Sequence, residues 1–203
     1  MLKEKKGSSI IEVTMLVIVL GIVGSVVVGV ILFFMQLFVY TPRALNVQKI
    51  GQELNEKVIE GDALVRGLRY ATNIIDASST QLSYTYGHLP DLPGQSVRFR
   101  WSAVDKKIYR STSSDGGLNW SGEIVIPQYL HNNTSILIDG KDVAGVIFSY
   151  KKDDDADWVL GTDSLTAIRR VIFSINVKTG TGSFKSFHGS CNLTSGVEIK
   201  KVQ

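Results

Sequence analysis

The chain has 203 residues, a formal net charge of +3 and a single cysteine. Beyond the N-terminus the lysines and arginines are scattered, so the composition provides no electrostatic footprint for nucleic acid. Because Cys191 is the single cysteine, the chain cannot form an internal disulfide framework or a cysteine-rich metal site. About 160 residues follow the apolar N-terminal region, which is enough to bury a core of their own.

The N-terminal region carries the most specific pattern in the chain. A short basic head ends at Gly7, Glu12 follows, and no charged side chain occurs from Val13 to Pro42. A helix needs about 20 apolar residues to cross a bilayer, and this stretch is longer. A cleavable secretory signal has an apolar region of roughly 7–15 residues before a small-x-small site, which is not found here. We therefore expect a retained membrane helix.

The charges at the start of the chain predict an orientation. Lys3, Lys5 and Lys6 precede the apolar stretch. Positive residues beside a membrane span hold their end in the cytoplasm, so the C-terminal portion is expected outside.

Glu12 is the unusual residue of this region. An ionisable group inside a bilayer costs roughly 2.5–3.5 kcal/mol on insertion scales, which makes it a candidate functional residue. The alternative is that Glu12 lies at the headgroup boundary, where a carboxylate costs little.

The segment Gly7-Ser8-Ser9-Ile10-Ile11-Glu12, followed by the apolar stretch, resembles the class III leader of type IV pilins and type II secretion pseudopilins. The resemblance implies that prepilin peptidase cleaves between Gly7 and Ser8, that Ser8 is a site for N-methylation, and that Glu12 is the assembly glutamate. The chain differs from the usual pattern in having Ser8 in place of phenylalanine. Gly29 occurs in the region where many members have a proline.

The same resemblance implies a division of the chain. Residues 1–7 form a leader peptide, residues 8–42 a membrane and assembly helix, residues 43–76 the second half of that helix, and residues 77–203 a β-rich head. Cleavage creates an α-amino group on Ser8, which Glu12 of a neighbouring subunit can pair with in a low-dielectric environment.

Residues 44–75 have a second helical pattern. Apolar residues recur at intervals of three and four, which predicts one buried helix face. A break is expected near Glu60-Gly61-Asp62, and Pro42 is compatible with a bend. The apolar positions are Leu45, Val47, Ile50, Leu54, Val58, Val65, Leu68 and Ala71.

After Ser78 the apolar period changes to two, which predicts strands. Residues 97–101 and 107–110 are expected to form a hairpin. A helix followed by strands indicates an α+β fold with the helix on an antiparallel sheet, and this layout faintly resembles J-type minor pseudopilins and W-type minor pilins. Further strands are expected at Leu82–Tyr86, Glu123–Pro127, Ile136–Ile138, Val143–Tyr150, Arg170–Val177, Phe184–Phe187 and Val197–Lys200.

Two motifs in the head suggest chemistry. Residues 113–120 match the Asp-box pattern Ser-x-Asp-x-Gly-x-x-Trp of sialidase-like propellers, but the pattern occurs once and is interpreted as a hairpin turn. Asp153, Asp155 and Asp157 are candidate oxygen ligands for calcium, the one cofactor considered. The alternative for this acidic run is a solvated turn between strands.

The sequence thus predicts a structural, non-enzymatic subunit, a minor pilin or minor pseudopilin. Its expected location is the cytoplasmic membrane, in a single pass, and after assembly a surface or periplasmic filament for adhesion, DNA uptake, motility or secretion. The expected partners are other pilins or pseudopilins, prepilin peptidase and the membrane. Two alternatives stay open: a membrane-anchored extracellular binding protein unrelated to pili and, from the Asp-box alone, a tethered glycan hydrolase.

Overall fold

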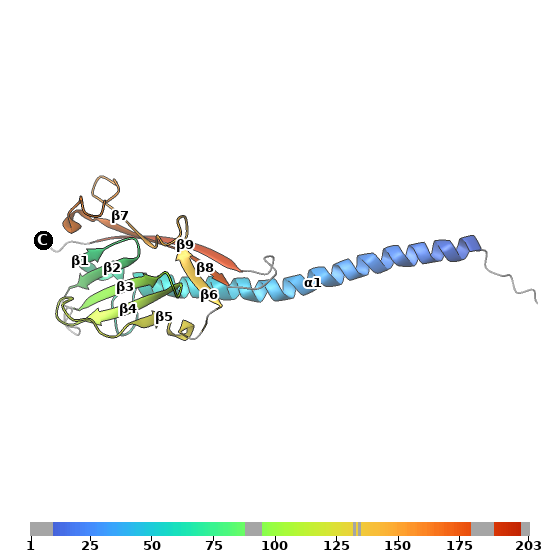
Figure 1. The fold of residues 1–203 in the computed structure, drawn as a ribbon, viewed down its shortest axis with the longest axis horizontal. Helices are drawn as coiled ribbons and strands as arrows, with labels where there is room; N and C mark the ends of the chain where they lie inside the picture. The colour runs from blue at the N-terminus through green and yellow to red at the C-terminus, as the bar shows by residue number, and fades with distance from the viewer. Residues whose placement is uncertain (1–9, 88–94, 132, 134, 180–188, 200–203) are drawn as a thin grey trace, which may run out of the picture. The chain divides into compact units, whose positions relative to one another are not determined.

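The computed structural model describes residues 10–87, 95–131, 133, 135–179 and 189–199. Two compact units divide the chain, one of residues 1–42 and one of residues 43–203. The helix α1 (Ile10–Ile59) begins in the first unit and ends in the second (Figure 1). Strands follow α1, so the fold is α+β as the sequence predicts.

Two antiparallel sheets make up the β part of the second unit. The first has the order β1-β2-β3-β4-β5, and in the second β8 pairs with β6 and β7 along one edge and with β9 along the other. The first sheet comprises β1 (Ala71–Ala77), β2 (Gln81–Tyr86), β3 (Ser96–Ser102), β4 (Lys107–Ser113) and β5 (Ile124–Ile126). The second comprises β6 (Ile136–Gly140), β7 (Phe148–Lys151), β8 (Arg170–Thr179) and β9 (Ser190–Glu198). Short 3₁₀ helices are η1 (Leu68–Tyr70), η2 (Gln128–Leu130) and η3 (Leu165–Ala167).

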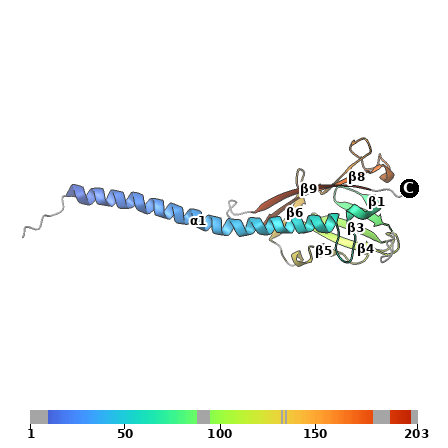
Figure 2. The ribbon, with the colours of Figure 1, turned by 180° about the vertical axis from the view of Figure 1, so that it is seen from behind.

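The C-terminal part of α1 supplies one wall of the core. Val47, Ile50, Leu54 and Val58 are fully or almost fully buried, and they recur at helical spacing. Gln48, Lys49, Gln52 and Glu56 on the opposite side are exposed. The strands lie in front of this part of α1 in Figure 1 and behind it in Figure 2, so one helix covers one face of the β part.

The sheets supply the other wall. Alternate residues of the central strands point inward, as the period of two predicts. Tyr84 and Phe99 lie with ring centroids 6.2 Å apart in the first sheet, and Phe148 and Phe173 lie 5.5 Å apart in the second. The remaining inward residues of these strands are Leu82, Tyr86, Val97, Trp101, Ile108, Tyr150, Val171, Ile175 and Val177.

A tight turn ends α1. Gly61 adopts a positive φ of 92°, and the Asp62 carboxylate accepts hydrogen bonds from the backbone N–H groups of Leu64 and Val65. Gly67 then passes so close to the helix end that a Cβ there would lie 2.3 Å from the carbonyl oxygen of Ile59. Only glycine fits such a close approach of two backbones.

The break predicted near Glu60-Gly61-Asp62 is confirmed, because α1 ends at Ile59, but the predicted continuation of the helix to residue 76 is wrong, because residues 71–77 form β1. The error has a physical cause. The pairing of β1 with β2 shifts register between Ala71 and Asn73 and again between Ile74 and Asp76. Such irregularities add a residue to one strand, so burial in β1 recurs every third residue and imitates a helical period.

Most predicted strands are confirmed, including the hairpin of β3 and β4. The strand predicted from Val143 begins later, at Phe148, because Asp139 accepts hydrogen bonds from the N–H groups of Gly140 and Gly145 and closes a turn there. The strand predicted at Val197–Lys200 is instead β9, which begins at Ser190. The strand predicted at 184–187 lies outside the described residues.

The buried Arg110 on β4 gives a prediction about stability. Arg110 is 5% exposed, and its Nη1 lies 2.5 Å from Oδ2 of Asp62. Asp62→Asn removes the charge that compensates this guanidinium and should lower the free energy of unfolding by about 2 kcal/mol. Urea unfolding of the full chain in detergent, followed by tryptophan fluorescence, measures the loss. Asp142→Asn, which changes an exposed carboxylate, is the control.

The same pair predicts a pH dependence. Burial alone would raise the pKa of Asp62, but hydrogen bonds from Arg110 and from two backbone N–H groups outweigh it and hold the pKa below its usual value of 3.8. A lowered folded pKa contributes stability above the unfolded pKa, and that stability is lost as pH falls through the folded pKa. The difference between wild type and Asp62→Asn should therefore shrink below about pH 4. A difference that stays constant from pH 7 to pH 3 would contradict this assignment.

Candidate functional site

The apolar part of α1 is the first candidate site. Among the described residues, one helix segment, Ile10–Met35, is long and apolar enough to cross a membrane. Its 26 residues are exposed within the unit. Within the described residues of this unit nothing covers this apolar surface, and such a surface is unfavourable in water, so the segment fits a helix that crosses a membrane once.

Glu12 lies in the first turn of α1 and is the one charged residue of this segment. The first backbone N–H groups of a helix have no partner within it and carry partial positive charge. A carboxylate in the first turn is therefore stabilised by the helix. Gly7 and Ser8, the other two residues of the predicted processing site, lie outside the described residues.

The other polar side chains of the segment hydrogen bond to their own helix. Thr14 Oγ1 donates to the carbonyl oxygen of Ile10 at 2.8 Å, and Ser25 Oγ donates to that of Ile22 at 2.7 Å. A hydroxyl that already has a partner costs less in an apolar environment. A carboxyl group such as that of Glu12 costs more than a hydroxyl in the same environment.

The Asp-box residues form a turn between β4 and β5, as predicted. Oδ1 of Asp115 accepts hydrogen bonds from the backbone N–H groups of Leu118 at 3.1 Å and Asn119 at 2.9 Å, and the side-chain amide of Asn119 donates to Oδ2. The bond from the Asn119 backbone, followed by that from the Ser113 hydroxyl, lowers the pKa of Asp115 far below its ordinary value. The carboxylate thus holds the turn together.

Trp120 anchors this turn on the outer face of the first sheet. The Arg98 guanidinium lies 4.6 Å from the centroid of the Trp120 ring, and a Cβ on Gly117 would lie 3.2 Å from the same ring. A cation over an aromatic face is attracted by the ring quadrupole. The tryptophan therefore has a packing role in the structure.

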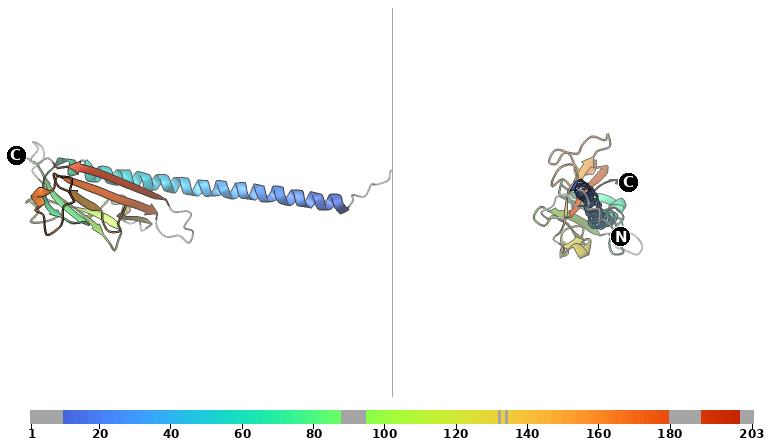
Figure 3. Two further views of the ribbon diagram at one scale, coloured as in Figure 1. Left: turned by 90° about the horizontal axis from the view of Figure 1, so that it is seen from above. Right: turned by 90° about the vertical axis from the view of Figure 1, so that its right-hand side faces the viewer.

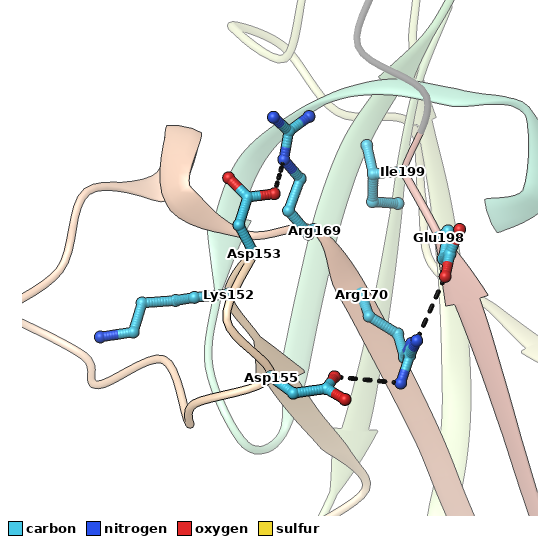
Figure 4. Close-up of a pocket in the computed structure, with 7 residues that line it drawn as sticks. All are labelled: Lys152, Asp153, Asp155, Arg169, Arg170, Glu198 and Ile199. Atoms are coloured by element: carbon cyan, nitrogen blue, oxygen red, sulfur yellow. Dashed lines mark hydrogen bonds and ion pairs between the residues drawn. The ribbon is translucent and has the colours of Figure 1, made fainter.

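The acidic run forms a network of ion pairs on the surface. Asp153 pairs with Arg169, and Asp155 pairs with Arg170 at 3.1 Å (Figure 4). Asp157 pairs with Lys151 at 2.8 Å. All three carboxylates are more than two-thirds exposed.

A pocket of about 360 Å³ lies within this network. Three carboxylates and three cations surround it, so its charges balance: Asp153, Asp155 and Glu198 against Lys152, Arg169 and Arg170. The structure thus brings the three calcium candidates near cations, and in the described part of the chain no three His, Cys, Asp or Glu side chains are grouped so as to hold a metal ion.

Sequence reasoning missed the cations of this network. Lys151-Lys152 and Arg169-Arg170 are adjacent pairs in the sequence, and each pair borders a strand end. Basic pairs beside the acidic run, at the ends of two predicted strands, could have indicated that the aspartates form ion pairs. The pairing of residues 148–151 with 170–173, which brings them together, was not predicted.

Compared with known proteins, the chain matches no family model, no curated protein and no solved structure.

The ion pairs predict that calcium does not stabilise the head. To bind Asp153, Asp155 and Asp157, a calcium ion must first displace the side chains of Arg169, Arg170 and Lys151 from these carboxylates. We expect the melting temperature of the full chain in detergent to be the same with calcium in the millimolar range, on the order of 10⁻³ M, as with a chelator. A rise with calcium that Asp155→Asn abolishes would establish a calcium site instead.

Proposed function

We propose that this chain is a prepilin-type structural subunit, a minor pilin or minor pseudopilin. It is cleaved between Gly7 and Ser8 by prepilin peptidase and is held in the cytoplasmic membrane by the apolar part of α1. It then enters a type IV pilus or a type II secretion-like filament through this helix. Adhesion, DNA uptake, motility and secretion are the activities that such filaments serve.

One observation carries the proposal: Glu12 occupies the first turn of an apolar helix segment and is its one charged residue. Counted from Ser8, Glu12 is the fifth residue, which is the position of the assembly glutamate in the resembled family. An ordinary anchor has no need of an ionisable residue, which costs free energy inside a bilayer.

The physical role of Glu12 follows from the amine that cleavage creates. The α-amino group of Ser8 has a reference pKa near 7.7–8.0 and is largely protonated at neutral pH. In a filament, Glu12 of one subunit pairs with the Ser8 amine of its neighbour. A buried charge without a partner is costly and a paired one is tolerated, so the pair selects one stagger between adjacent helices.

The charges before the helix support the orientation of the proposal. Lys3, Lys5 and Lys6 hold the N-terminus in the cytoplasm, where prepilin peptidase acts, and leave residues 43–203 outside. The α+β fold, with a helix covering one face of the sheets, suits a pilin-like head.

The cleavage step predicts the mass of the mature chain. Protein purified from its native membrane should lack residues 1–7, and Gly7→Leu should retain them, because the peptidase requires a small residue before the cut. Intact-mass spectrometry of both proteins measures this. A wild-type chain with a complete N-terminus would contradict the proposal and favour an anchored binding protein.

The charge pair predicts a separation of processing from assembly. Glu12→Leu should be cleaved normally, while its share in sheared filaments falls roughly tenfold or more, because the neighbouring amine loses its partner. Immunoblots of sheared filaments and of membranes give the ratio. Thr14→Val is the matched control, since Thr14 bonds to its own helix. Unchanged incorporation of Glu12→Leu would refute the charge-pair role.

A further inference from the structure

The edge of the second sheet that β6 and β7 form beside β8 is closed by hydrogen bonds from the chain itself. On β6, the N–H of Ile138 donates to the carbonyl oxygen of Lys106, and Nε1 of Trp101 donates to the carbonyl oxygen of Ile138 at 2.7 Å. On β7, the N–H of Phe148 donates to Ser79, and the carbonyl oxygen of Tyr150 accepts from Trp158. A strand from another molecule would have to displace these bonds.

The two edge strands of the first sheet, β1 and β5, are poorly suited to pairing with another chain. β1 carries register shifts at two places, and β5 has three residues. Irregular and very short edge strands are devices by which proteins avoid pairing with other chains.

β9 is different. It pairs with β8 over nine consecutive residues without a register shift, and in the described part of the chain no strand pairs with its other edge. Figure 3 shows β9 as a long, regular strand beside β8. Between Ser190 and Val197 it contains no charged residue and no proline.

The hydrogen bonds between β8 and β9 show which backbone groups of β9 point toward its unpaired edge. Just before β9 begins, the N–H of Thr179 donates to the carbonyl oxygen of Gly189. Just after β9 ends, the N–H of Ile199 donates to the carbonyl oxygen of Arg169. Because such bonds alternate along an antiparallel pair, odd-numbered residues of β9 bond to β8 and even-numbered residues face the open edge. The residues that face outward are Ser190, Asn192, Thr194, Gly196 and Glu198, and all are exposed.

A groove of about 630 Å³ follows this edge between β9 and the last turns of α1. Its apolar floor is formed by Ile59 and Val197, both nearly buried. Ser195 and Gly196 supply part of the wall. An added strand would therefore find both backbone partners and a site for an apolar side chain, the two elements of strand-addition recognition.

The rim of the groove indicates the chemistry of the occupant. Glu56, Glu60 and Glu198 line it. Glu60 pairs with Arg69 at 2.7 Å and Glu198 with Arg170 at 3.1 Å, and within the described residues no ion pair joins Glu56 to a cation. Oδ1 of Asn55, also in the lining, is buried and has no hydrogen-bond partner within the described residues. The carboxylate of Glu56 and the unused acceptor of Asn55 favour an occupant with a lysine or arginine side chain.

We propose that β9 is a strand-accepting edge, and that its occupant is an extended basic segment of a partner protein. The segment pairs with the outward backbone groups of β9, places an apolar side chain on Ile59 and Val197, and directs a cation to Glu56 on the rim. This proposal does not depend on cleavage at Gly7, so it can fail or succeed separately from the proposed function.

The test uses the full chain in nanodiscs and a phage-displayed library of random dodecapeptides. Enriched peptides should contain lysine or arginine, and their binding should slow amide exchange at Asn192, Thr194 and Gly196. Oγ1 of Thr194 accepts hydrogen bonds from Lys141 and Ser174, so Thr194→Val, which removes only these side-chain bonds, is the control. Thr194→Pro also removes one outward N–H and leaves the backbone bonds to β8, since proline is tolerated on an edge. It should weaken binding at least tenfold.

Glu56→Lys provides a second test in case the proline variant fails to fold, because Glu56 is exposed on α1. It should also weaken the same peptides at least tenfold, while Asp142→Lys, an equal charge change elsewhere on the surface, leaves their affinity unchanged. The proposal is overturned if no peptide is enriched over empty nanodiscs, if enriched peptides ignore both variants, or if the outward amides are already protected in the chain alone.

Discussion

The second unit depends on one packing constraint, the burial of the apolar stripe that α1 presents from Val47 to Val58. A helix segment of this length is not stable alone in water, so its persistence requires a surface that covers the stripe. The inward residues of the two sheets provide that surface. The chain must then reverse directly after Ile59, which explains why Gly61 and Gly67 stand in a turn that larger residues could not form.

The acidic residues of the chain show how environment decides what a carboxylate does. Asp62 compensates a buried guanidinium, and Asp115 gathers backbone N–H groups to hold a turn. Asp155 is exposed and pairs with a cation of the next strand, an arrangement that contributes little to stability. Glu12 is the one that lies in an apolar helix segment. Its environment, rather than its chemistry, makes it the candidate functional residue.

The filament proposal and the strand-acceptor proposal rest on different parts of the chain. The first concerns the apolar helix and the residues before it, and the second concerns β9 and the groove beside it. Together the two proposals give the chain two ways of binding other proteins. Helix packing in lipid is governed by charge pairing and close approach, whereas strand addition is governed by backbone hydrogen bonds.

The sequence by itself determined the apolar span, the position of Glu12, the α+β order and most strands, because periods of 3.6 and 2 and the lack of charge are local properties of the chain. Only the tertiary structure decided that residues 71–77 are a strand, since bulges in its pairing with β2 produce a period of three. It also decided that Asp153, Asp155 and Asp157 face cations, and that β9 has an open edge. These features depend on which distant segments become neighbours in the fold, and a local sequence pattern does not predict that pairing.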